Sequence, residues 1–502
     1  MIVWMTLIGL VACKGEDPAD PSPSPEPTGS PSVTESPDTG SGLPTGTTPP
    51  TPTAATGSTS ETGTPFTGTL PLPFADGRPP RHLLMLSIDT LRRDALTRYG
   101  GDGSMDFLDG LLDDSYALDD HLACSNWTLH STSCAMTGAQ PMSWGFLPTV
   151  MGTPVPPLPP GIEMIPGWLG DEGFVSALVT TNNIFSSNLN NATGFDEEYR
   201  APNTRSTPAA VAGEELRQRM LAMPKGSRRY GHLHLMEPHQ PYAPPIDYLS
   251  DLIPLGPIAY DLGDTDGHNA AVYDLITGAL TGAEADKVIA HMKIRYRGEL
   301  QYLDDQLEAW WATMQADGLL DDTLVVVWTD HGEQFFEHGY QTHAWTLHDE
   351  ETEALLFFWS DQLSGVQHSG PTSGIDMAPT VLASLGVPVP SSIEGLTVDQ
   401  IPADRPRFTA VSGKGGVFQA VVTPTHKLHY GWTDPADPPE FAPYSQGIYV
   451  YDRVADPDEA TNLFDAGDPT TQDLWNLLLP QVEAALPLTT ETPTWPAGLP
   501  QP

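Results

Sequence analysis

Positive charge is scarce in this sequence, which has 22 lysines and arginines against 65 acidic residues and a net charge of −43. This balance excludes a general attraction to nucleic acids or anionic membrane surfaces, because both are negatively charged themselves. An anionic substrate would have to be held by a local positive centre, and a bound metal ion is one candidate. Hydrophobic residues make up 39% of the 502-residue chain, which is enough to bury a core.

A membrane-spanning hydrophobic run is lacking at the N-terminus, because residues 1–12 fall short of the ~20 residues that a transmembrane helix needs. The run has the length of a signal-peptide core, and Leu10-Val-Ala-Cys13 resembles the lipobox of bacterial lipoproteins. We therefore predict a lipoprotein signal peptide over residues 1–12 and a lipid anchor on Cys13. The expected location is the bacterial cell envelope, at the outer membrane because Lys14 follows the cysteine, with the chain periplasmic or surface-exposed. An uncleaved apolar start is the alternative.

Cysteine is also rare. The chain has three cysteines, and Cys124 and Cys134 remain once Cys13 is assigned to the anchor. An oxidising envelope would permit a disulfide between them. Two buried free thiols explain the sequence equally well, so the pairing stays open.

Residues 13–76 consist largely of proline, serine, threonine and glycine with scattered acidic residues. A segment of this composition cannot bury enough apolar surface to offset the entropy that ordering would cost. We expect a disordered tether that spans roughly 45 Å as a coil between the anchor and the rest of the chain. A glycosylated stalk is the alternative.

The composition changes after Arg81, where four continuous apolar runs predict strands that are buried on both faces of a sheet. These runs are residues 82–88, 174–180, 230–236 and 323–329. Between them lie helical patterns, clearest over residues 288–315, where apolar residues recur every three or four positions. Strands that alternate with helices predict an α/β fold with a mostly parallel sheet.

Candidate metal ligands stand directly after two of these runs. Asp89 follows the first run, and Asp330-His331-Gly332 follows the last. The carboxyl ends of parallel strands meet at one edge of a sheet, so these residues are expected to share a crevice. Carboxylates and imidazole can hold a metal ion, although a single Asp after a strand is more often a helix cap.

Thr128 opens a predicted helix that runs to Thr137-Gly138. A hydroxyl at this end lies among free backbone N–H groups at the positive end of the helix dipole, where an oxyanion binds well. Threonine is a poor nucleophile unless a metal or a base activates it, and a metal lowers the pKa of an oxygen acid that binds to it. A plain helix cap is the alternative.

Six segments, in this order along the chain, resemble the landmarks of sulfatases within the alkaline phosphatase superfamily. They are residues 86–96 around Asp89, 126–138 around Thr128, 234–245 around His239, 329–333 with the following His343, 375–382 and 451–463. The resemblance, over about residues 82–480, implies a large, mostly parallel sheet sandwiched by helices, with a smaller C-terminal α+β part. We expect the catalytic domain over residues 77–390, and a C-terminal subdomain and tail over residues 391–502.

The resemblance implies a metal centre in which Asp89, Asp330 and His331 bind one divalent ion, while Thr128 coordinates it and attacks the substrate. A histidine ligand favours Mn²⁺ or Zn²⁺ over Ca²⁺, which prefers shells of oxygen atoms. A second metal is not expected, because no histidine follows residues 304–305 at helical spacing.

The resemblance also gives roles to histidines outside the metal centre. His239 and His343 would contact the non-bridging or leaving oxygens, and His343 would be the general acid for the leaving group. His338 and His348 are predicted to be ordinary surface or core residues. His130, which stands where relatives have proline, could line the site or fill space.

Departures from the family pattern bear on the reaction. Typical sulfatases convert a Cys or Ser nucleophile to formylglycine, which Thr128 cannot form, and the Pro and Arg that guide this conversion are missing. Relatives with a threonine nucleophile and an Asp-His ligand pair act on phosphoryl groups. We therefore expect hydrolysis of phosphate or phosphonate esters more than of sulfate esters. The substrate would be a small anionic ester, free or carried on a glycan or lipid.

Two other functions stay open. A catalytically dead, metal-binding surface protein would explain the lack of basic residues beside Thr128. A transferase of phospho-head groups would use the same site, but the dedicated membrane transferases carry several transmembrane helices.

Overall fold

The computed structural model describes residues 69–147, 155–202, 206–413, 416–432, 447–489 and 493–501. The predicted signal peptide, Cys13 and the tether as far as residue 68 lie outside these ranges. The folded chain begins before the predicted boundary at residue 77, because Leu72 and Phe74 are buried in the core. In the described part of the chain, no helix combines the length and the hydropathy needed to cross a membrane.

Eight strands form one large sheet in the order β10-β2-β9-β6-β1-β5-β3-β4. Neighbours pair in parallel except at β9, which is antiparallel to both β2 and β6. The strands are β1 His82–Ile88, β2 Tyr116–Leu122, β3 Phe174–Thr180, β4 Glu197–Arg200, β5 Arg228–Leu235, β6 Thr323–Thr329, β9 Leu356–Trp359 and β10 Val366–Ser373. The predicted α/β fold with a mostly parallel sheet is confirmed, and the four apolar runs correspond to β1, β3, β5 and β6.

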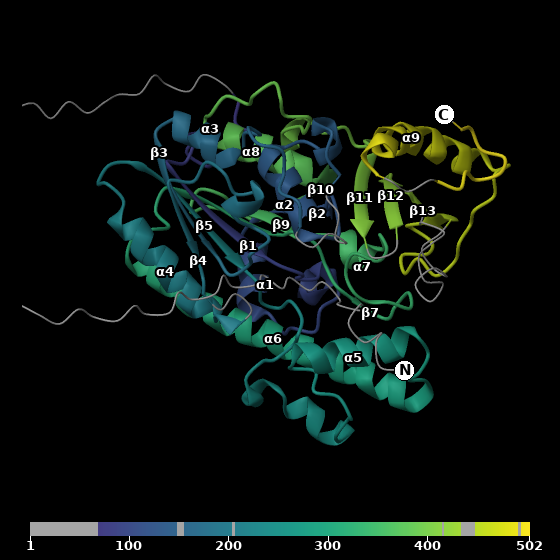
Figure 1. Ribbon diagram of the computed structural model, residues 1–502. Helices are drawn as coiled ribbons and strands as arrows, with labels where there is room; N and C mark the ends of the chain where they lie inside the picture. The colour runs from purple at the N-terminus through teal and green to yellow at the C-terminus, as the bar shows by residue number, and fades with distance from the viewer. Residues whose placement is uncertain are drawn as a thin grey trace, which may run out of the picture. The chain divides into compact units, whose positions relative to one another are not determined.

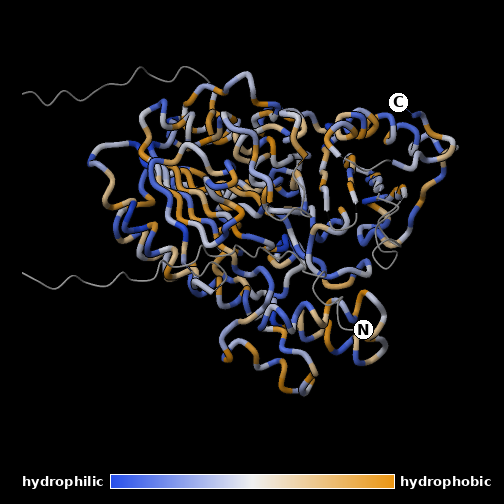
Figure 2. Tube along the Cα trace, in the orientation of Figure 1, coloured by the Kyte–Doolittle hydropathy of each residue, from blue (hydrophilic) through white to orange (hydrophobic). Residues whose placement is uncertain are grey.

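Helices cover both faces of this sheet, and the alternation of side chains along each strand divides the core between them. Along β1, Leu83 and Met85 pack with α2, α3 and α8, whereas Leu84 and Leu86 pack with α1, α4, α5 and α6. The helices are α1 Asp106–Asp113, α2 Thr128–Thr137, α3 Ile165–Asp171, α4 Ala209–Ala222, α5 Thr265–Ile276, α6 Gly282–Ala316 and α8 Met377–Ser384. Figure 1 shows α3 and α8 on one side of the strands and α4 and α6 on the other, and Figure 2 shows stretches of the hydrophobic colour along strands inside the sheet.

A second, smaller sheet occupies the C-terminal part, as predicted for an α+β region. Its antiparallel strands, in this order, are β11 Arg407–Gly413, β12 Gly416–Val422, β13 His426–Trp432 and β14 Gly447–Asp452. Helix α9, Pro469–Ala485, packs against this sheet through Leu474, Trp475 and Leu478 (Figure 1). Between β6 and β9 the chain forms the short strands β7 Gln334–Phe335 and β8 Gln341–Thr342 and the helix α7 Asp349–Thr352.

Candidate functional site

The carboxyl ends of β1 and β6 bring Asp89 and Asp330 side by side. The two strands are parallel neighbours whose last residues, Ile88 and Thr329, stand in register. Asp89 and the pair Asp330-His331 directly follow those residues, and all three side chains are fully buried. One ligating atom from each lies within 4.8 Å of the others. The structure thus places the three predicted metal ligands in one crevice at the edge of the sheet.

Thr128 is the first residue of helix α2 and adjoins this cluster. Its Oγ1 lies 3.4 Å from Asp89 Oδ2 and 3.5 Å from His331 Nε2. The N-cap position of the helix belongs to Trp127, so Thr128 is not the plain cap that the sequence left as an alternative. The helix therefore presents the Thr128 hydroxyl to Asp89 and His331, two of the predicted metal ligands, at the positive end of its dipole.

Two buried carboxylates this close repel each other unless a cation balances them. Burial, and then the charge of Asp330, raise the pKa of Asp89 well above its ordinary value. Asp89 Oδ1 and Asp330 Oδ2 have no hydrogen-bond partner, which native interiors rarely tolerate. A divalent cation would satisfy both oxygens, and two carboxylates with one imidazole are a donor set that suits such an ion. The residues present therefore fit a divalent metal ion.

His331 is held in the tautomer that a metal ligand needs. Its Nδ1 lies 2.9 Å from the carbonyl oxygen of Gly332 and donates to it, which leaves Nε2 as the basic nitrogen. Nε2 lies 3.5 Å from Asp330 Oδ2 and 3.8 Å from Asp89 Oδ1. Gly332 is required at this turn, because a Cβ there would overlap the carbonyl oxygen of Glu350.

Two further side chains contact Asp89, and the sequence analysis assigned neither. Asn182, which follows β3, donates from Nδ2 to Asp89 Oδ2 at 2.5 Å. His234, near the end of β5, has Nε2 3.9 Å from the same oxygen and Nδ1 2.7 Å from Ser87 Oγ. Burial lowers the pKa of His234 to about 4, so its ring is neutral. The sequence does contain a signal for both residues, because each lies near the end of one of the four apolar runs. The same position identified Asp89 as a candidate.

A second layer of histidines adjoins the metal ligands. The ring centroid of His343 lies 4.4 Å from that of His331 and 5.1 Å from that of His239. His343 Nδ1 is 3.0 Å from Glu333 Oε1, and Glu333 Oε2 accepts from the Tyr242 hydroxyl at 3.1 Å. Because a carboxylate only accepts, His343 donates from Nδ1, and Nε2 is the nitrogen that would exchange a proton with a substrate. Glu333 thus fixes the orientation of the His343 ring, and the sequence analysis gave Glu333 no role.

The backbone adopts unusual conformations beside these residues. Thr90, Thr342 and Ala344 have φ angles of 58°, 73° and 68°, in the left-handed region that residues with a side chain rarely adopt. Thr90 follows Asp89, and the other two flank His343. Such conformations persist where the surrounding structure enforces them, and they cluster at functional sites.

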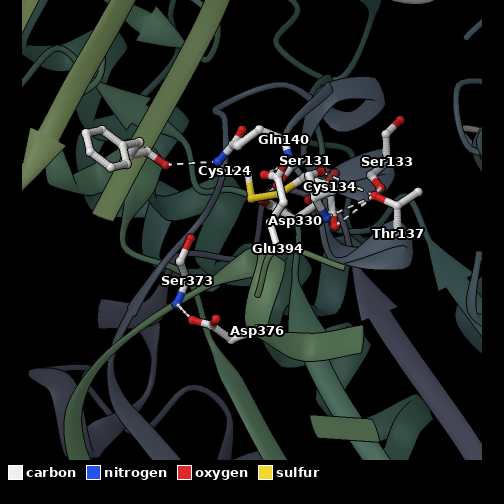
Figure 3. The surroundings of a disulfide bond; sticks show 12 residues. Cys124, Ser131, Ser133, Cys134, Thr137, Gln140, Asp330, Ser373, Asp376 and Glu394 are labelled. Atoms are coloured by element: carbon white, nitrogen blue, oxygen red, sulfur yellow. Dashed lines mark hydrogen bonds between the residues drawn. A yellow bond between two sulfur atoms is a disulfide. The ribbon is translucent and has the colours of Figure 1, made fainter. Parts of the chain in front are cut away.

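A disulfide joins Cys124 to Cys134 and encloses the start of helix α2 (Figure 3). This finding decides between the two alternatives that the sequence left open. Beside it, Ser131 Oγ donates to the main-chain oxygen of Asp330 at 2.5 Å. The helix that carries Thr128 is thus tied covalently to the preceding loop and by a hydrogen bond to the loop of Asp330 and His331.

Other polar residues that the sequence singled out serve the fold. His130 is fully buried, and burial lowers its pKa to about 4, so it is a neutral side chain of the interior. Asp304 accepts from the N–H groups of Phe107 and Leu108 at the start of α1. Asp305 accepts from a tyrosine hydroxyl at 2.6 Å. Residues 304–305 therefore stabilise neighbouring segments through these hydrogen bonds.

The family model described as Sulfatase matches residues 81–387, more than half of the chain, and the chain belongs to the sulfatase family of the alkaline phosphatase superfamily. Members of this family are ester hydrolases that bind a divalent metal. Arylsulfatase K of Xenopus laevis is 26% identical over 216 residues, which are 39% of this chain and 38% of that protein. The multifunctional alkaline phosphatase superfamily protein PehA of Trinickia caryophylli is 29% identical over 122 residues, 23% of each chain. The chain thus matches less than two-fifths of the length of these relatives.

Solved structures share the fold over nearly their whole length. One is a complex of a protein with its substrate D-glucosamine-2-N,6-O-disulfate, with a TM-score of 0.65 and 17% identity, covering 81% of this chain and 98% of that chain. Another is a phosphonate monoester hydrolase from Silicibacter pomeroyi, with a TM-score of 0.59 and 18% identity, covering 81% and 96%. At these identities the likeness establishes the fold alone.

Proposed function

We propose that this chain hydrolyses phosphate or phosphonate esters with Thr128 as the nucleophile, at a centre where Asp89, Asp330 and His331 hold one divalent metal ion. One observation carries the proposal: Thr128 Oγ1 lies within 3.5 Å of both an Asp89 oxygen and His331 Nε2, at the first residue of a helix. A nucleophile, an anion-binding helix end and a set of metal ligands therefore converge on one point.

The first step joins Thr128 Oγ1 to phosphorus and breaks the bond between phosphorus and the leaving oxygen. The hydroxyl proton passes to Asp89 Oδ2, which lies 3.4 Å away. His343 donates a proton from Nε2 to the leaving oxygen, which departs as an alcohol. A divalent ion, when bound, lowers the pKa of the Thr128 hydroxyl and draws negative charge from the ester oxygens.

The second step hydrolyses the phosphothreonine. His343, now neutral, takes a proton from a water molecule whose oxygen attacks phosphorus. The bond from phosphorus to Thr128 Oγ1 breaks, and Oγ1 regains its proton from Asp89. Glu333 keeps the His343 ring in place through Nδ1, while His239 and the backbone N–H groups at the start of α2 stabilise the non-bridging oxygens.

The nucleophile favours phosphorus over sulfur as the attacked atom. Threonine cannot form the formylglycine of typical sulfatases, and the imidazole of His331 favours Mn²⁺ or Zn²⁺ over Ca²⁺. The fold shared with a phosphonate monoester hydrolase supports this choice. Sulfate esters on glycans are the second candidate, because a protein whose structure is a complex with a disulfated glucosamine shares the fold with a higher TM-score.

The proposal places this activity in the bacterial cell envelope. Residues 1–12 would be the signal peptide, Cys13 the site of the lipid anchor, and the Pro/Ser/Thr/Gly-rich segment after it the tether. The disulfide between Cys124 and Cys134 supports an oxidising location. Mass spectrometry of the N-terminal peptide from membrane fractions tests the anchor: an unmodified Cys13 would contradict it.

Turnover of matched nitrophenyl esters by the full chain, loaded with Mn²⁺ or Zn²⁺, tests the reaction. The esters are a phosphate monoester, a phosphate diester, a phosphonate monoester and a sulfate. We expect the highest kcat/KM for a phosphorus ester, and a loss of at least about a thousandfold in Thr128→Ala. A preference for sulfate would overturn the substrate assignment, and full activity in Thr128→Ala would overturn the nucleophile.

Thr137→Ala is the matched control for this experiment. It removes another buried threonine hydroxyl, at the far end of the same helix, where Oγ1 donates to the main-chain oxygen of Ser133 at 2.7 Å. This variant should keep its turnover, because the lost hydroxyl faces the helix backbone and no metal ligand.

A further inference from the structure

Two histidines and a glutamate outside the proposed reaction gather near the start of α7, between the large sheet and the C-terminal sheet (Figure 1). His338 lies in the turn between β7 and β8, and His348 is the N-cap residue of α7. Their rings stack in parallel with centroids 3.5 Å apart. Glu459 Oε2, from the segment after β14, lies 2.8 Å from His348 Nδ1. One ligating atom from each of the three residues lies within 4.8 Å of the others.

This group is anchored in the interior and open on one side. The side chains of His348 and Glu459 are only 7% and 2% exposed. His338 Nε2 lies 3.3 Å from Glu350 Oε2, and neither buried atom completes a hydrogen bond. A pocket of about 700 Å³ opens beside the four side chains, and Tyr449 and Tyr451 of β14 also line it. Such a pocket leaves room for water or a ligand oxygen next to the histidines.

The charges around the group favour a cation. Lys427 lies 2.9 Å from Glu459 and 2.8 Å from Asp349, so two carboxylates share one ammonium group. Three carboxylates, those of Asp349, Glu350 and Glu459, thus lie at this group with one ammonium among them, so a divalent ion there would meet negatively charged surroundings.

We propose that His338, His348 and Glu459 bind a second divalent transition-metal ion of the zinc class. Two imidazoles and one carboxylate form a ligand set that Zn²⁺ accepts with one position left for water or a substrate oxygen. His338 and His348 lie at the two ends of the segment that contains His343. An ion bound to both histidines and to Glu459 would therefore fix both ends of this segment to the chain that follows β14. The site is additional to the proposed hydrolysis and does not depend on it.

Counting zinc on the full chain tests this site. Bound metal is first removed with a chelator, and the protein is then dialysed against Zn²⁺. In the double variant Asp89→Asn/Asp330→Asn, which disables the other metal centre, we expect one zinc ion per chain to remain. Adding His348→Gln should weaken zinc binding by roughly a hundredfold or more. Removing a residue that only supports a metal ligand already lowers the affinity by about 10- to 100-fold, and removing a ligand itself should lower it further. Co²⁺ should give visible absorption bands in the double variant that disappear with His348→Gln.

His291→Gln is the matched control, because it removes another partly buried imidazole, on α6, whose Nε2 lies 2.9 Å from the main-chain oxygen of Gly256. It should leave the zinc count unchanged. A double variant that binds neither zinc nor cobalt overturns the proposal, and so does unchanged binding after His348→Gln. If His348→Gln unfolds in the chelator, His338→Asn provides the same comparison, with retained zinc overturning the proposal and lost zinc supporting it. A chain that turns over no ester would refute the proposed hydrolysis and leave the zinc count unaffected.

Discussion

The molecule has two clusters of histidine and carboxylate whose charges are balanced differently. The first is Asp89, Asp330 and His331, named the catalytic cluster after the reaction proposed for it, and the second is the outer cluster, His338, His348 and Glu459. Among the described residues, the ion-pair contacts of Asp89 and Asp330 are with histidines alone. In the outer cluster, by contrast, Glu459 has the ammonium group of Lys427 at 2.9 Å.

This difference separates a site that needs a cation from one that can persist without it. The catalytic cluster combines full burial, a raised pKa at Asp89 and two carboxylate oxygens without hydrogen bonds, so its charged form depends on an ion from outside the chain. The outer cluster has its own lysine, and a metal there adds to a structure that is already held together. Activity should therefore follow the catalytic cluster, whereas the outer cluster should affect stability.

The largest expected difference is in turnover. Asp330→Asn removes a charge and a metal ligand from the catalytic cluster, and kcat/KM should fall at least about a thousandfold. Glu459→Gln removes a carboxylate of the outer cluster that touches no reacting group, and kcat/KM should stay within about tenfold of the parent. Kinetics on the best ester measure both variants. Equal losses would erase the functional distinction between the clusters.

The next largest effect is on stability, and it concerns Lys427, which contacts the outer cluster. Lys427→Met leaves Asp349 and Glu459 without their buried partner, so the free energy of unfolding should fall by about 3–5 kcal/mol. Lys293→Met is the control, because Lys293 is half exposed and its contact with Glu337, at 3.3 Å, should contribute at most about 1 kcal/mol. Denaturant titration compares the two. Similar losses would show that Lys427 does not balance the outer cluster.

The disulfide between Cys124 and Cys134 lies next to the catalytic cluster, because the loop that it closes contains Thr128. Replacing Cys124 and Cys134 with alanine opens a loop of about ten residues around Thr128, and the free energy of unfolding should fall by about 2–3 kcal/mol. Denaturant titration of the variant and of the reduced parent should give matching losses. An unchanged midpoint in both would contradict the constraint that we assign to this disulfide.

A smaller effect is expected at the residue that orients His343. Glu333→Gln keeps the shape but removes the anionic partner of Nδ1, and kcat should fall by about tenfold to a hundredfold. The alkaline limb of the pH–rate profile should move to lower pH, because the imidazolium form of His343 loses its stabilising charge. A lower kcat with an unmoved profile would indicate a purely structural role for Glu333.

The smallest expected effect is on the pH dependence of stability, and it comes from His130, the neutral histidine of helix α2. Burial lowers the pKa of His130 to about 4 from its ordinary 6.5, so the folded chain binds fewer protons than the unfolded chain between these values. Stability is therefore lost as pH falls through this window, by about 1 kcal/mol for this residue between about pH 7 and about pH 5.5. His130→Gln should flatten the dependence of the free energy of unfolding on pH by that amount. If the free energy of unfolding changed with pH to the same extent in His130→Gln and the parent, the role given to His130 would be contradicted.

The sheet could be predicted because strands buried on both faces are continuous apolar runs, as in residues 82–88 and 323–329. The meeting of Asp89 and Asp330 could be predicted because both directly follow such runs, and parallel strands end at a common edge. The true start of the fold was missed because Leu72 and Phe74 are isolated apolar residues in a segment that its composition marks as disordered.

The remaining site residues depend on contacts that no local pattern encodes. Glu333 is close to His331 in the sequence, but its contact with His343 forms only because the loop between them folds back. The outer cluster is less predictable still, because 111 residues separate His348 from Glu459 along the chain. Packing between the large sheet and the C-terminal region creates that contact, and the sequence alone carries no periodicity or motif that reports it.

The most direct test of the central claim is to trap the covalent intermediate. The metal-loaded chain would be mixed with a phosphate ester, quenched in acid within one turnover and digested for peptide mass spectrometry. We predict a phosphoryl group on Thr128 and none on the same peptide of Thr128→Ala. A phosphoryl group on another residue, or continued turnover by Thr128→Ala, would contradict the account.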